Sequence, residues 1–225
     1  ENLQGLGVIG QMYNNADGGW SSIVPTQNLL DMYEMNDGLT KEESKLYDPK
    51  YPFKDRDPRM EMTMLFPGQL WQNQSRETVI LNTLDKEIDG ALNDNYPEGV
   101  SNASKTALSW SKYLAPMDQY NNIWDTGACP IVFRYAEVLL SFAEAENELN
   151  GPSNAVYESL DKIRIRVGMP TVNRGKYGTK ETLRELIRRE RTIELAGEGL
   201  RKADILRWKD SEGKMLAEKV MNGNL

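Results

Sequence analysis

Apolar residues recur at helical spacing between Arg134 and Lys209, and this pattern restricts the fold more than any other feature of the chain. Steps of three and four residues place side chains on one face of an α-helix. Glycine and proline interrupt the pattern, as they do where helices end. The pattern predicts a first helix that stops at Asn150–Pro152, a second that ends at Gly168, a third that Thr179 caps and Gly197 breaks, and a short fourth from Leu200 to Trp208.

Each of the three longer helices has a predicted apolar face. A helix of a globular protein packs such a face against its neighbours, so these residues form the candidate core of the helical region. They are Tyr135, Val138, Leu139, Phe142 and Leu149 in the first helix, Val156, Leu160, Ile163 and Val167 in the second, and Leu183, Leu186, Ile187 and Ile193 in the third.

The first two helices, joined by a tight turn, resemble one tetratricopeptide-type unit of roughly 34 residues. The sequence contains one such unit. A lone helix pair cannot bury its own apolar face, and about three stacked units are normally needed for stability. Either other helices of this chain cover the pair or its neighbours lie outside this sequence, and we favour the second alternative.

Three blocks of the helical region and three upstream blocks, in this order along the chain, resemble the SusD/RagB family of outer-membrane glycan-binding lipoproteins. The helical blocks are RYAEVLLSFAEAENE (134–148), DKIRIRVGMP (161–170) and RERTIELAGEGLRKADILRW (189–208). The upstream blocks are PTQNLLDMYEMNDG (25–38), YPFKDRDPRM (51–60) and SKTALSWSKYLAP (104–116). The resemblance implies a mainly α fold with tetratricopeptide-like helix packing, long irregular loops and a few short β-hairpins.

The resemblance also implies how much of the family is represented. Family members begin with a lipoprotein signal and a helical-repeat half, and they continue past the position that matches Leu225. We therefore expect this chain to be the C-terminal half of a SusD-like protein. Within it, residues 1–130 are expected to be loop-rich and partly extended, and residues 131–225 helical, the two together forming one SusD-like C-terminal domain.

The function that the resemblance implies is non-catalytic binding of an oligosaccharide or polysaccharide. Family members bind glycan at the bacterial outer-membrane surface and deliver it to a SusC-like TonB-dependent transporter. The full-length protein would then be surface-exposed and lipid-anchored in the outer membrane. Two alternatives stay open: a carboxylate-based glycoside hydrolase, and a helical-repeat adaptor that binds only protein.

Composition excludes several other functions. The 34 acidic residues exceed the 27 basic ones by seven, and a net negative charge disfavours nucleic acid as a partner. The chain contains no histidine, which excludes Ser-His and Cys-His catalysis and histidine-ligated metal sites within it. Carboxylate chemistry remains open, because glycosidases need only two acids. The lone cysteine, Cys129, is expected to be a small buried hydrophobe.

Glu190, Glu194 and Glu198 fall at successive four-residue steps along the third predicted helix. Like charges at that spacing repel by roughly 0.2–0.5 kcal/mol per pair unless cations neutralise them. We interpret the row as part of a structural ion-pair network rather than an acid/base or metal site, because helical di-metal sites use histidine. The candidate cations are Arg134, Arg164, Arg166, Arg191 and Arg201.

Residues 1–130 contain many turn-forming residues, and three loop tryptophans lie beside amides or acids there. Aromatic rings can cover the C–H faces of sugars, while amides, carboxylates and arginine meet the hydroxyls. Each of these tryptophans has an alternative interpretation as a partly buried packing residue. The candidate glycan-binding residues are, in order of preference, Trp20 with Tyr13, Asn14, Asn15 and Asp17; Trp71 with Gln72; and Trp124 with Tyr120.

Other sequence signals are assigned to structure rather than to a site. Trp110 and Trp208 are expected in the core, and the runs TVILNTL (78–84) and ALSW (107–110) are candidate strands. The segment from Asp85 to Gly90 opens like a calcium loop, but its twelfth position is Tyr96 rather than glutamate. We therefore predict no metal and no cofactor.

Overall fold

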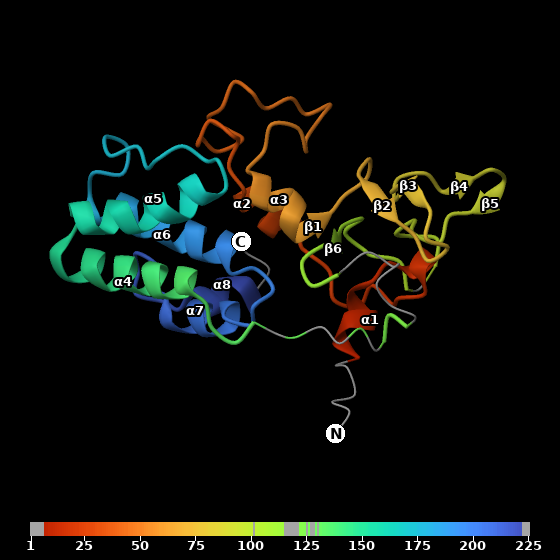
Figure 1. The fold of residues 1–225 in the computed structure, drawn as a ribbon. Helices are drawn as coiled ribbons and strands as arrows, with labels where there is room; N and C mark the ends of the chain where they lie inside the picture. Colours follow the sequence, from red (N-terminus) through yellow and green to blue (C-terminus); the bar gives the residue numbers. More distant parts are fainter. Residues whose placement is uncertain are drawn as a thin grey trace. The chain divides into compact units, whose positions relative to one another are not determined.

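A computed structural model describes residues 7–100, 102–114, 122–124, 126, 129 and 131–221 (Figure 1). The chain divides into two compact units. The loop unit contains residues 1–30 and 60–130, and the helical unit contains residues 31–59 and 131–225. Residues 31–59, which lie before the boundary expected near residue 130, therefore belong with the helices.

Three long helices form the centre of the helical unit: α4 (Tyr135–Asn150), α5 (Asn154–Arg166) and α6 (Lys180–Glu194). Helix α4 packs against both α5 and α6, and the shorter α7 (Arg201–Arg207) packs with α8 (Leu216–Met221) (Figure 1). Thr179 caps α6 through a capping box with Thr182, as its position in the sequence predicted. The four predicted helices are confirmed, whereas α8 was not predicted.

The apolar face predicted for α4 is wrong in most of its members. The helix buries Ala136, Leu139, Leu140 and Ala143 against its neighbours. Tyr135, Val138, Phe142 and Leu149 are instead 65%, 41%, 45% and 80% exposed. Both rows have helical spacing, so periodicity alone could not choose between them. The buried row contains two alanines, which allow α5 and α6 to approach closely, and the larger side chains lie on the other side.

The predicted faces of α5 and α6 are confirmed except at one position. Val156, Leu160 and Ile163 of α5 are buried, as is the whole predicted row of α6, but Val167 is only partly buried. The indole of Trp208 is 3% exposed and that of Trp110 is 8% exposed, so both are packing residues as expected. Cys129 is exposed, so the expectation that it is buried is wrong. The apolar residues that follow it, Ile131 to Phe133, are exposed as well.

Short helices and two-stranded antiparallel sheets make up the remaining described elements. The helices are α1 (Val8–Met12), the 3-10 helix η1 (Asn15–Asp17), α2 (Gln27–Met32) and α3 (Pro58–Thr63). The sheets pair β1 (Met64–Leu65) with β6 (Ser109–Trp110), β2 (Leu70–Gln72) with β3 (Thr78–Ile80), and β4 (Glu87–Ile88) with β5 (Ala91–Leu92). This confirms the expected fold class, mainly α with long loops and short hairpins. The two predicted strand runs supply β3 and β6.

The acidic row forms the predicted ion-pair network, but it does not lie on a single helix: Glu190 and Glu194 belong to α6, whereas Glu198 lies in the turn that follows it. Glu190 is fully buried and accepts hydrogen bonds from Arg164 and, at 2.8 Å, from Arg59. Glu194 lies 3.1 Å from Arg59 and 2.6 Å from Arg134. Glu198 lies 2.8 Å from Arg134. The row therefore joins α6 to α5, to the residue that precedes α4 and to the start of α3.

Several members of the network were not predicted, among them Arg59, Asp57 and Glu34, and two predicted cations lie elsewhere. Arg59 is held by Asp57 at 2.6 Å, and Arg164 reaches Glu34 at 2.7 Å. Arg191 pairs with Asp204 at 2.8 Å instead of with the acidic row. The guanidinium of Arg201 donates to the hydroxyl of Thr192 at 2.8 Å and lies over the ring of Trp208.

Among the described residues, no helix combines the length and the apolar character that crossing a membrane requires.

Candidate functional site

The segment that follows α1 folds so that the carboxylate of Asp17 points into the loop unit. The side chain of Asn14 caps η1, and its Oδ1 accepts a hydrogen bond from the amide of Asp17 at 3.0 Å. The next residue, Gly18, has φ 81°, a left-handed conformation that glycine adopts at little cost. The chain can therefore turn sharply between Asp17, which is buried, and Trp20, which is exposed.

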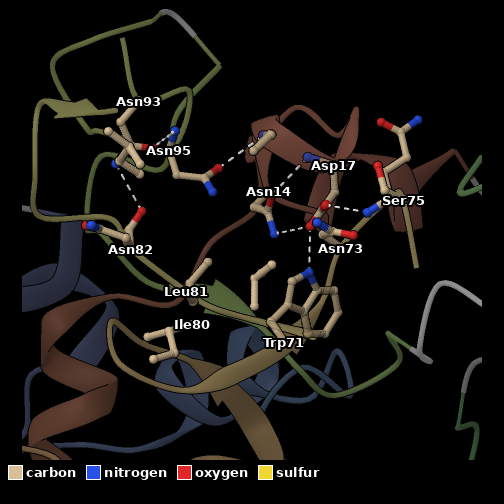
Figure 2. Close-up of a pocket in the computed structure, with 14 residues that line it drawn as sticks. Asn14, Asp17, Trp71, Asn73, Ser75, Ile80, Leu81, Asn82, Asn93 and Asn95 are labelled. Atoms are coloured by element: carbon tan, nitrogen blue, oxygen red, sulfur yellow. Dashed lines mark hydrogen bonds between the residues drawn. The ribbon is translucent and has the colours of Figure 1, made fainter. Parts of the chain in front are cut away.

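Three donors converge on the carboxylate of Asp17 (Figure 2). Its Oδ2 accepts hydrogen bonds from the indole N–H of Trp71 at 2.5 Å and from Nδ2 of Asn14 at 2.6 Å. Its Oδ1 accepts from the backbone N–H of Gln74 at 2.8 Å. Hydrogen bonds to an ionised acceptor are short and strong, so Asp17 fixes both the Trp71 ring and the turn after β2.

The ring of Trp71 is positioned by a contact with Tyr13 as well as by the hydrogen bond of its N–H to Asp17. The Tyr13 ring packs against it with centroids 6.1 Å apart and planes inclined by 56°. The side chain of Tyr13 has no exposed surface, so the prediction that it contacts ligand directly is corrected. Tyr13 directly follows α1 and packs against the indole, so its role is to support the Trp71 ring.

A cavity of about 360 Å³ opens beside Trp71. Apolar groups from Trp71, Ile80 and Leu81 form one part of its wall, and amides approach from two sides (Figure 2). The lining residues that carry polar side chains are Asn14, Asp17, Asn73, Gln74, Ser75, Asn82, Asn93 and Asn95. This combination of a hydrophobic wall and amide edges can accept a molecule with a C–H face and a hydroxyl rim.

The side-chain amides of Asn82 and Asn93 stabilise the loops that border the cavity through hydrogen bonds to the backbone. Asn82 accepts from the backbone N–H of Leu84 and of Asp85, each at 3.1 Å. Asn93 donates to the carbonyl oxygens of Asn82 at 3.1 Å and Asp85 at 2.8 Å, and accepts from Asn95 N at 2.9 Å. These two side chains are therefore already engaged in shaping the loop.

Other polar groups of the cavity remain available to a ligand. Asn95 uses its Oδ1 to accept from Ala16 N, and Asn73 uses its Oδ1 to accept from Glu77 N. Within the described part of the chain, the Nδ2 groups of Asn73 and Asn95, the side-chain amide of Gln74 and the Ser75 hydroxyl make no hydrogen bond to protein. The cavity thus presents uncharged donors and acceptors.

A second feature of the loop unit is a pair of indoles, one exposed and one partly buried. Trp20 is 51% exposed, and its ring meets that of Trp124 edge to face with centroids 4.8 Å apart. Trp124 lies directly on α1 at Gly10, where an added Cβ would stand only 2.2 Å from its ring. The structure therefore brings together two of the predicted tryptophans, while Trp71 belongs to the cavity.

Substituting Gly10→Ala is expected to displace the Trp124 indole and so disrupt the Trp20–Trp124 pair, because the new methyl group would overlap the ring. Tryptophan fluorescence should change in intensity and emission wavelength. Gly7→Ala is the matched control, since an added Cβ at Gly7 meets nothing within 4 Å. Identical spectra for the two variants would contradict the packing of Trp124 on α1.

The remaining predicted residues have separate positions. Nδ2 of Asn15 donates to the carbonyl oxygen of Asp94 at 3.2 Å, which links η1 to the loop after β5. Gln72 lines a different cavity of about 390 Å³, on which Trp71 also borders. Tyr120 lies outside the described residues.

Several cavity residues were missed because their sequence context resembles a strand or a turn. Asn82 lies in the run 78–84 that is predicted as a strand, and Asn95 and Asn93 lie in and beside a turn-forming segment. Asn73 and Gln74 directly follow Gln72, the one candidate chosen beside Trp71. Asp85, Glu87 and Asp89 lie around the β4–β5 hairpin. In the described ranges, no three or more acidic or cysteine side chains come together in a way that could hold a metal ion.

Comparisons with known proteins point to one family. The model of the SusD family matches residues 3–224. A SusD-like protein of Formosa agariphila is 46% identical over 144 residues, which cover 64% of this chain and 24% of that protein. A second SusD-like protein of the same organism is 40% identical over 83 residues, covering 34% of this chain and 16% of that protein.

Solved structures agree with the sequence comparison. The crystal structure of a SusD-like carbohydrate-binding protein from Bacteroides fragilis superposes with a TM-score of 0.72 at 32% identity, covering 91% of this chain and 39% of that one. Another SusD-like protein from Bacteroides fragilis gives a TM-score of 0.70 at 28% identity, covering 92% and 40%. This chain thus spans about a quarter of the first curated relative and about two-fifths of these solved chains. It belongs to the SusD family.

Proposed function

We propose that this chain binds an oligosaccharide or polysaccharide in the cavity beside Trp71 and does not cleave it. The observation that carries the proposal is the cavity itself: a wall formed by Trp71, Ile80 and Leu81 faces uncharged polar groups, several of which make no hydrogen bond to the described protein. These groups are the Nδ2 atoms of Asn73 and Asn95, the Gln74 amide and the Ser75 hydroxyl. A sugar ring has a matching division into C–H faces and hydroxyl edges. The exposed ring of Trp20, packed against the partly buried Trp124, provides a further aromatic surface for a longer glycan.

The acids of the cavity support binding rather than hydrolysis. Glycosidases place two carboxyl groups about 5–10 Å apart across the scissile bond. Asp17 is the sole acid among the described residues that line this cavity, and both of its oxygens already accept hydrogen bonds from the protein. The described lining therefore supplies one carboxyl group, whereas the hydrolase alternative requires two.

The wider setting is also part of the proposal. Because the chain spans less than half of its relatives, the delivery of glycan to a SusC-like TonB-dependent transporter is proposed for the longer SusD-like protein. The proposed location is the outer-membrane surface, with a lipid anchor on the full-length protein. Support for both comes from membership of the SusD family.

A glycan array followed by calorimetry and chromatography of the incubated glycan tests this function. We expect binding without released products. Gln74→Ala should weaken binding by about three- to tenfold, the effect of one net hydrogen bond, because the Gln74 side chain is exposed at the cavity and its loss leaves the fold intact.

Asn102→Ala is the control, because Asn102 is an exposed residue of the same unit that does not line the cavity. Release of shorter sugars would replace the proposal with hydrolysis. Failure to bind any array member, or equal affinities for the Gln74 and Asn102 variants, would reject the cavity as the glycan site.

A further inference from the structure

We infer that the cavity beside Trp71 selects uncharged sugar residues over sulfated sugars and uronates. The inference rests on the proposed function and adds the class of glycan. Its starting point is the charge of the lining: among the described residues that border the cavity there is no lysine or arginine, and Asp17 is the one ionisable group.

The unused polar groups of the cavity suit hydroxyls. The Nδ2 groups of Asn73 and Asn95 donate, the Gln74 amide both donates and accepts, and the Ser75 hydroxyl does both as well. A sugar hydroxyl also donates and accepts, so each contact can be satisfied in either direction. A sulfate or carboxylate only accepts, and it would leave the accepting groups of Gln74 and Ser75 unmatched.

An anion would also lack a compensating charge. Moving an ionised group from water into a partly enclosed site is costly unless a cation pairs with it. Asp17 adds repulsion, because its carboxylate is held at the cavity by Trp71 and Asn14. Neutral donors alone offset only part of these two unfavourable contributions.

Nearby basic residues do not supply the missing cation. Lys105 donates to the carbonyl oxygens of Pro97 at 2.7 Å and Val100 at 3.2 Å, which ties its ammonium to a loop. Arg76 follows Ser75 in the β2–β3 turn, and Lys86 precedes β4, yet neither borders the cavity. The electrostatic character of the site is therefore set by Asp17 and neutral amides.

Matched glycan pairs test the inference. The first pair is an algal galactan in its native sulfated form and after desulfation. The second pair is a pectic galacturonan before and after reduction of its carboxyl groups. Each glycan that binds on the array is also compared with its sulfated derivative. Calorimetry should show at least about tenfold tighter binding of the uncharged member of each pair that binds. Its affinity should change little between about 0.01 and about 1 M salt, since no ion pair is screened.

Gln74→Arg places a cation at the cavity and should reduce or reverse the preference for the uncharged member. Asn102→Arg adds the same charge to the unit outside the cavity and should leave the preference unchanged. Equal or tighter binding of the sulfated or uronate members by the unaltered chain overturns the inference while leaving glycan binding in place. Failure to bind any pair or array glycan rejects the proposed function together with the inference.

Discussion

Replacing Glu190 by alanine is expected to lower the free energy of unfolding by about 3–5 kcal/mol. Glu190 is fully buried and accepts hydrogen bonds from two guanidinium groups, those of Arg59 and Arg164. Those arginines are themselves only 4% and 2% exposed. The substitution would leave positive charge inside the helical unit without the anion that compensates it, and water cannot replace that anion without opening the packing.

Urea denaturation followed by circular dichroism measures this change, and α6 offers a matched control. Glu185 lies on the same helix, its side chain is 69% exposed, and it pairs with Arg188 at 3.3 Å. Glu185→Ala should change stability by less than about 1 kcal/mol, as exposed pairs do. Glu194→Ala should cost more than about 1 kcal/mol, because Glu194 is buried and pairs with the buried Arg59 as well as with Arg134. Similar losses for Glu190→Ala and Glu185→Ala would contradict a structural network.

The same network predicts how stability responds to acid. Burial alone would raise the pKa of Glu190, but the charges of Arg59 and Arg164 outweigh it and lower that pKa below 4.5. The resulting stabilisation is complete above pH 4.5 and is lost as pH falls through the lowered pKa. Glu190→Gln should remove this part of the acid sensitivity.

Glu34 changes the pH dependence of stability in the opposite direction. Burial, opposed by Arg164, leaves the pKa of Glu34 above 4.5. Its protonated form therefore favours the folded state below pH 4.5, and this contribution is lost as pH rises through the raised pKa. A Glu34→Gln variant should show less of that loss, which separates the two carboxyl groups experimentally.

Local signals allowed most of the helical unit to be predicted. The N-cap at Thr179 and the apolar row of α6 can both be recognised within one short segment, and both are confirmed. The predictions that were wrong depended on residues distant in the sequence. Helix α4 has two apolar rows at helical spacing, and only its packing against α5 and α6 determines that the row with Ala136 and Ala143 is buried. Arg59 lies 131 positions from Glu190, a distance that no local pattern encodes.

The site was predicted in part for the same reason. Asn14 and Asp17, which are near one another in the sequence and were chosen together as candidates, contact each other at η1. That Asp17 would bind the Trp71 indole, 54 positions away, could not be inferred from either segment. Tyr13 has the composition of an exposed loop residue, yet packing beneath Trp71 buries it completely.

Replacing Asp17 by asparagine is expected to reduce glycan affinity by at least about tenfold and to destabilise the fold by about 2–3 kcal/mol. The carboxylate of Asp17 accepts from donors on both oxygens: Trp71 Nε1 and Asn14 Nδ2 on one, and Gln74 N on the other. Asparagine has one accepting oxygen and an NH₂ group, so either orientation places a donor against a donor. The indole would lose its fixed orientation, or the turn at Gln74 would shift.

Calorimetry with an array-identified glycan and urea denaturation measure the two effects separately. Asp89→Asn is the matched control: Asp89 is exposed at the β4–β5 turn with φ 52°, a conformation that asparagine tolerates, and it does not line the cavity. If Asp17→Asn weakened the fold but left affinity unchanged, Trp71 and Gln74 would have no part in binding. The coupling of both losses is what distinguishes a carboxylate that positions a sugar-binding wall from one that only stabilises a loop.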